Sequence, residues 1–103
     1  MNNLVKNVVY SGISFRQGEF KNDGSMVRKL PDELKNQILN YLKAPEPALI
    51  GDVRLIDPVT GNCYNRTNII RQKDGFEWSS AVIYMLEHYD IRLSDEFLKM
   101  FKQ

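Results

Sequence analysis

The chain has 103 residues, 43% of them hydrophobic and 26% charged, and a formal net charge of +1. This length and composition are those of one globular domain with its own core, and they argue against intrinsic disorder. A single cysteine excludes an intramolecular disulfide framework, and no apolar run is long enough to span a membrane. A charge so near zero lacks the basic excess that most nucleic-acid-binding proteins carry.

We therefore expect a single domain over residues 1–103. The N-terminus lacks the apolar region of a secretory signal, so the expected compartment is the cytoplasm. Residues 4–10 are rich in Val and Tyr, which predicts a strand. Residues 11–25 hold three glycines and isolated aromatic residues, which favours short strand pieces, with a mobile loop as the alternative. Loose order is thus an open alternative for residues 1–29.

A helix is predicted from residue 30 to residue 43. Pro31 suits a first helical turn, two carboxylates follow it, and apolar residues then recur at helical spacing. Pro45 disfavours helical geometry in the residue before it, so the helix should end at Lys43 or Ala44.

A β-hairpin is predicted next. Residues 49–56 alternate between apolar and charged side chains, with Val53 and Leu55 on one face and Asp52 and Arg54 on the other, which is typical of a half-buried strand. A turn over residues 57–62 allows residues 63–72 to return as the second strand. Asp52 and Asp57 should point to opposite faces, and we assign them turn and solubility roles.

Residues 78–101 predict two packed helices. Ser94 is well placed as an N-cap, and Leu93 and Leu98 occupy the positions of a hydrophobic staple around it. The fold class that follows is α+β, with a small antiparallel sheet (an N-terminal strand plus the central hairpin) packed against three helices. The first of the two closing helices should carry an apolar stripe at helical spacing: Trp78, Ala81, Val82, Met85, Leu86 and Tyr89.

Catalytic chemistry finds little support in the residue types. His88 is the only histidine and Cys63 the only cysteine, and nothing else in the sequence indicates that they meet as a nucleophile and its base. The same two residues fall short of the three or four ligands of a zinc site. We therefore expect no enzyme activity, no metal and no cofactor.

Two groups of residues are candidates for contacts with a partner. Tyr84 lies off the apolar stripe and is predicted to be an exposed anchor, beside Glu87, His88 and Asp90 on the polar side. Tyr64 and Arg66 form the second group. With Arg71 and Lys73 they could make a nucleic-acid-binding patch, although charges on one strand are more often a solvated edge.

Several segments together resemble a known group of proteins. Their order is similar to that in small bacterial immunity proteins, which are often encoded beside polymorphic or contact-dependent toxins. The resemblance covers about residues 30–101 and leaves the first 29 residues unaccounted for. The segments that carry it are Leu55-Ile56-Asp57-Pro58, Thr60-Gly61, Asp74-Gly75-Phe76-Glu77-Trp78-Ser79-Ser80, Ile83-Tyr84, Tyr89-Asp90-Ile91-Arg92-Leu93 and Glu96-Phe97.

The resemblance implies a cytoplasmic protein that binds one cognate toxin domain and blocks its active site or its access to substrate. No binding residue carries over, because the shared positions are largely structural. A local acidic group could face a basic toxin: Glu87, Asp90, Asp95 and Glu96. The alternatives are another protein-interaction or regulatory module, such as an adaptor or a phage-type accessory factor, and a nucleic-acid-binding regulator.

Overall fold

A mixed sheet and the helices packed on it make up the fold, which a computed structural model describes over residues 5–101. The strands lie in the order β1-β4-β3-β2, with β1 parallel to β4 and the other pairs antiparallel. The predicted α+β class, with a small sheet against three helices, is confirmed, although β1 makes the sheet mixed. The elements in chain order are β1 (Lys6–Asn7), α1 (Asp32–Lys43), β2 (Leu49–Ile56), β3 (Cys63–Lys73), β4 (Phe76–Ser79), α2 (Ser80–Tyr89), α3 (Asp95–Leu98) and a 3-10 turn (Lys99–Phe101).

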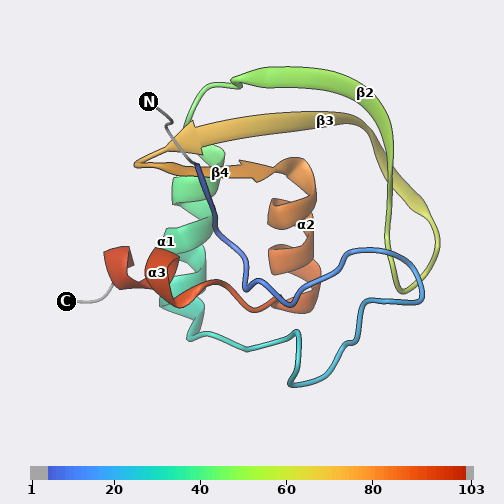
Figure 1. Ribbon diagram of the computed structural model, residues 1–103, viewed down its shortest axis with the longest axis horizontal. Coiled ribbons are helices and arrows are strands. Elements are labelled where there is room, and N and C mark those ends of the chain that lie inside the picture. Colours follow the sequence, from blue (N-terminus) through green and yellow to red (C-terminus); the bar gives the residue numbers. More distant parts are fainter. Residues whose placement is uncertain (1–4, 102–103) are drawn as a thin grey trace.

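The two longer helices lie side by side beneath β3 and β4, whereas β2 runs along the far edge of the sheet (Figure 1). The core therefore forms between β4, α1, α2 and the C-terminal segment. The Trp78 indole connects β4 to α1, because its Nε1 donates a hydrogen bond of 2.8 Å to the carbonyl of Leu42. The buried apolar residues are Val8, Leu30, Ile38, Leu42, Phe76, Trp78, Val82, Met85, Leu86, Ile91, Leu93, Phe97 and Leu98.

The prediction that Trp78 begins a helical stripe is wrong, because Trp78 belongs to β4 and α2 starts at Ser80. The strand runs into the helix without a loop. Ser80 fixes this junction: its Oγ accepts a hydrogen bond from the Ile69 amide, and its own amide donates to Oδ1 of Asn68. Trp78 is buried all the same, since it points from the sheet toward the helices.

The N-terminal segment packs across the helices (Figure 1). Val9 forms an isolated bridge with Leu93, and Val27 forms another with Ile91, so the segment after α2 has a neighbour on each side. The strand predicted for residues 4–10 is reduced to Lys6–Asn7 and the Val9 bridge, and residue 4 lies outside the described residues. The strand pieces favoured for residues 11–25 are wrong, because turns and irregular backbone occupy this segment.

The predicted bounds of β2 are confirmed, but its half-buried face is not. Leu49 is 65% exposed, Ile50 60% and Val53 46%. The reason lies in the topology, since β2 is the edge strand that lies farthest from the helices (Figure 1).

The predicted cap at the start of α3 is confirmed. The Ser94 Oγ accepts a hydrogen bond of 3.1 Å from the Phe97 amide, and Leu93 and Leu98 are both buried. A side-chain oxygen at this position satisfies one of the amides that have no partner in the first helical turn.

Candidate functional site

The turn between β2 and β3 is built around a buried carboxylate. Asp57 is only 3% exposed, and its Oδ1 accepts hydrogen bonds from the amides of Val59 and Thr60 at 2.8 and 3.0 Å. Gly61 closes the turn with φ +79, a conformation that side chains other than glycine rarely adopt. The turn role predicted for Asp57 is thus confirmed, whereas its solubility role is wrong.

Two tyrosines of α2 complete the surroundings of Asp57. The hydroxyl of Tyr84 donates to Oδ2 at 2.5 Å, and the hydroxyl of Tyr89 lies 2.8 and 2.7 Å from the two oxygens. Burial by itself would raise the pKa of Asp57, but the hydrogen bonds from Tyr84, Thr60, Tyr89 and Val59 outweigh it and lower the pKa to about 2. The carboxylate therefore stays ionised and holds the hairpin turn against α2.

The same contacts keep both tyrosines neutral. The hydrogen bond to Asp57, followed by burial, raises the pKa of Tyr84, and burial with the Asp57 hydrogen bond raises that of Tyr89 to about 12. A neutral phenol can donate to the carboxylate, whereas a phenolate cannot. The cluster is therefore a stable structural link at neutral pH.

This link fixes a row of aromatic side chains, which we call the aromatic ridge: Tyr64 of β3 with Tyr84 and His88 of α2. The rings of Tyr64 and Tyr84 are stacked, with centroids 3.6 Å apart and planes within 6°. The imidazole of His88 lies 4.2 Å from the Tyr84 ring, centroid to centroid. Tyr84 is half-buried, not exposed as predicted, and His88 is the exposed end of the ridge.

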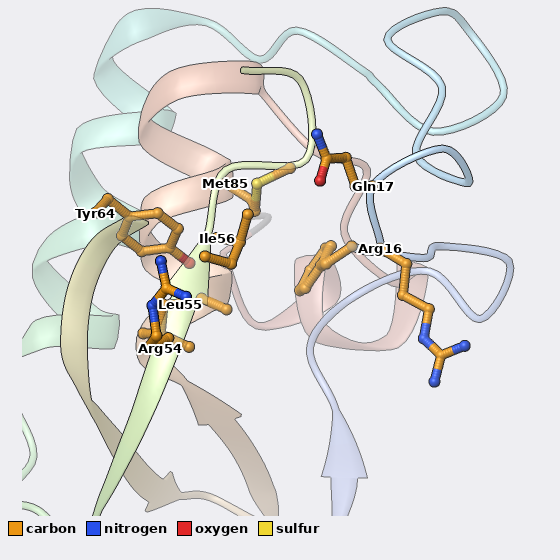
Figure 2. A pocket seen from close by; sticks show the side chains of 9 residues that line it. Arg16, Gln17, Arg54, Leu55, Ile56, Tyr64 and Met85 are labelled. Carbon is orange, nitrogen blue, oxygen red and sulfur yellow. The ribbon is translucent and has the colours of Figure 1, made fainter. Parts of the chain in front are cut away.

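A hollow of ≈ 400 Å³, the Met85 hollow, opens on one side of Tyr64. Figure 2 shows the Arg54 side chain beside Tyr64, while the guanidinium of Arg16 points away from the other labelled side chains. β2, α2 and the loop of residues 15–17 enclose it, and its floor is mainly apolar. The lining residues are Phe15, Arg16, Gln17, Arg54, Leu55, Ile56, Tyr64, Ala81 and Met85.

A second hollow of ≈ 330 Å³, the Ile83 hollow, is also lined by Tyr64. It brings together three of the predicted partner-binding residues, namely Tyr64, Tyr84 and Glu87. Lys43, at the end of α1, forms an ion pair of 2.7 Å with Glu87 in its lining. The lining is completed by Asn65, Ser80 and Ile83.

Asp90 and Arg66 do not line the Ile83 hollow. Asp90 caps α2 in a left-handed conformation with φ 54, and its carboxylate forms an ion pair of 2.8 Å with Lys35. Arg66 is exposed on β3 and borders a separate hollow at the edge strand. Of the six predicted partner-binding residues, the structure therefore brings Tyr64, Tyr84, Glu87 and His88 together and places Asp90 and Arg66 elsewhere.

The basic patch proposed for β3 is not assembled. Arg71 donates from Nε to the carbonyl of Pro45 at 2.8 Å, and the Lys73 ammonium lies over the Tyr41 ring, 5.6 Å from its centroid. Arg71 and Lys73 thus contact α1 and the segment that follows it, while Arg66 lies exposed beside a hollow at the edge strand.

The residues considered for catalysis have separate surroundings. The Cys63 thiol donates to the carbonyl of Asn65 at 3.3 Å, whereas His88 packs on Tyr84. Within residues 5–101, no group of three or more His, Cys, Asp and Glu side chains is placed to hold a metal ion. None of the helices described is long and apolar enough to cross a membrane.

Comparisons with known proteins add no family. The chain matches no protein-family model, no curated protein and no solved structure.

Proposed function

We propose that this protein is a protein-binding module of the toxin-neutralising type, and that its partner contacts the aromatic ridge and the Ile83 hollow. The observation that carries the proposal is the stacked pair of Tyr64 and Tyr84. Tyr64 lines both hollows, Tyr84 lines the Ile83 hollow, and the Tyr84 hydroxyl is held by buried Asp57. Aromatic side chains are enriched among the residues that dominate binding at protein interfaces.

The ridge is suited to binding because it is already ordered. Tyr84 is held at its hydroxyl by Asp57 and at its ring by Tyr64, so neither ring has much rotational freedom to lose when a partner binds. Ordering a mobile side chain costs about 0.5–1.5 kcal/mol, and a surface fixed in advance avoids that cost.

Most of the acidic residues that were candidates for contact with a basic partner form ion pairs within this chain. Glu87 pairs with Lys43, Asp90 with Lys35 and Glu96 with Lys6. Three of the four acidic residues considered for contact with a basic toxin are thus neutralised by lysines of this chain. This favours a partner that is recognised by shape and apolar contact more than by opposite charge.

The toxin-neutralising part of the proposal rests on the resemblance. Two of the segments that carry it, at residues 55–58 and at residues 83–84, meet where Tyr84 contacts Asp57. The resemblance and the site therefore share residues. We therefore expect a cognate toxin domain to bind on the aromatic ridge.

A growth assay tests this function. The polypeptide encoded directly upstream of the gene would be expressed from an inducible promoter, alone or with this protein. We expect the wild-type protein to restore growth. We expect Tyr64→Ala to fail, with a dissociation constant raised at least tenfold, or about 1.4 kcal/mol, because it removes one ring of the ridge.

Tyr10→Ala is the matched control, because Tyr10 is also a partly exposed tyrosine but packs on the guanidinium of Arg92 and lines neither hollow. It should neutralise as the wild type does. Circular dichroism would verify that both variants fold. The proposal is contradicted if the upstream polypeptide is harmless, or if Tyr64→Ala protects as well as the wild type.

A further inference from the structure

The edge strand β2 is unusual for a strand at the border of a sheet. In the part of the chain that the structure describes, β3 lies on one side of it and no strand lies on the other. Leu49 and Ile50 point to opposite faces, yet both are at least 60% exposed. Exposed apolar edge strands readily pair with another strand, so proteins usually keep such strands short, charged or covered.

The charges of β2 are arranged symmetrically about Val53. Asp52 precedes it and Arg54 follows it, and within residues 5–101 neither is part of an ion pair. When two identical strands run antiparallel about a shared residue, the residue before it faces the residue after it in the other strand. The charges of β2 are therefore complementary to those of a second β2.

We propose that β2 pairs antiparallel with β2 of a second copy of this chain, with the two-fold axis at Val53. Asp52 of each copy then lies opposite Arg54 of the other, which gives the pairing two ion pairs. Ile50 lies opposite Ile56, so apolar surface is covered at both ends of the paired stretch. Opposite charges and apolar side chains facing each other across antiparallel strands both stabilise a sheet.

The surface beside Val53 has room for such a neighbour. A hollow of ≈ 520 Å³ there is lined by Asp52, Val53, Arg54 and Arg66. A carboxylate arriving from the second copy would meet the exposed guanidinium groups of Arg54 and Arg66. The pairing of β2 with β3 shifts register in this stretch, between Asp52 and Leu55. Irregular edge strands are one device by which sheets avoid edge pairing, so a wild type that stays monomeric is the outcome that would overturn the proposal.

Sedimentation velocity over about two decades of protein concentration distinguishes a dimer formed through β2 from a monomer. We expect the wild type to form a dimer as concentration rises. Asp52→Arg alone should weaken dimerisation about tenfold, because it places arginines opposite each other twice, and Arg54→Asp alone should do the same with aspartates. The double variant Asp52→Arg/Arg54→Asp should dimerise like the wild type, because it restores both pairs.

Mixing the two single variants gives the sharpest result. One carries two arginines at these positions and the other two aspartates, so together they should form a heterodimer that native mass spectrometry detects, although neither dimerises well alone. Asp95→Arg makes the same charge change at an exposed position of α3, and this variant should dimerise like the wild type. A wild type that stays monomeric throughout overturns the proposal, as does a dimer that none of the β2 variants changes.

Discussion

Replacing Asp57 with alanine is expected to lower the free energy of unfolding by about 3 kcal/mol, since it removes a buried charge that accepts hydrogen bonds from two amides and two phenols. The hydroxyls of Tyr84 and Tyr89 would lose their acceptor, and the turn would lose its centre. Urea unfolding followed by circular dichroism measures the change. Asp52→Ala, an exposed aspartate on the adjoining strand, should cost less than about 0.5 kcal/mol in dilute solution. Equal effects of the two substitutions would contradict the structural role of Asp57.

The same carboxylate makes stability depend on pH. The folded protein lowers the pKa of Asp57 from its ordinary value of 3.8 to about 2. A carboxyl group whose pKa is lower in the folded state stabilises that state above the unfolded pKa, and this contribution disappears as pH falls through the folded pKa. The stability difference between wild type and Asp57→Asn should therefore be largest above pH 4 and shrink toward pH 2. A difference that stays constant over this range would mean that ionisation of Asp57 is not the cause.

Replacing Trp78 with alanine is expected to cost about 3–5 kcal/mol, which is the range for removing a large aromatic side chain from a core. Trp78 is buried, packs against the ring of Tyr41, and donates the hydrogen bond that joins β4 to α1. Circular dichroism must follow the unfolding, because Trp78 is the only tryptophan.

Trp78→Phe separates packing from the hydrogen bond. It keeps an aromatic ring in the core but leaves the Leu42 carbonyl without its donor, so it should cost less than Trp78→Ala. If Trp78→Ala cost less than about 1 kcal/mol, the core between β4 and α1 would not be the main source of stability.

Local signals account for the parts of the fold that the sequence predicts well. Pro31 and the acidic residues after it mark the start of α1, and Ser94 with Leu93 and Leu98 marks the start of α3. These signals act within one helical turn, so they can be read without knowing what packs nearby.

The errors come from contacts between distant segments. Trp78 fits a helical stripe by its spacing, but the helix begins two residues later, and a buried indole suits either element. Asp57 looks like an ordinary turn residue, and its burial depends on Tyr84 and Tyr89, which lie 27 and 32 residues further along the chain.

The candidate site was predictable only in part for the same reason. Tyr64 and Tyr84 were both singled out from the sequence, but for different partners, and no sequence signal indicates that their rings stack. The exposure of β2 also depends on topology, because alternating residues predict a strand without saying which strand lies at the edge.

Photo-crosslinking in the native cell tests most directly whether the aromatic ridge is the surface that binds a partner. The photoreactive residue p-benzoylphenylalanine would replace His88, the exposed end of the ridge, and in a control Lys99, which is exposed in the C-terminal 3-10 turn. We expect one discrete adduct with the upstream-encoded polypeptide from position 88 and none from position 99. An adduct with that polypeptide from position 99 and none from position 88 would contradict this expectation.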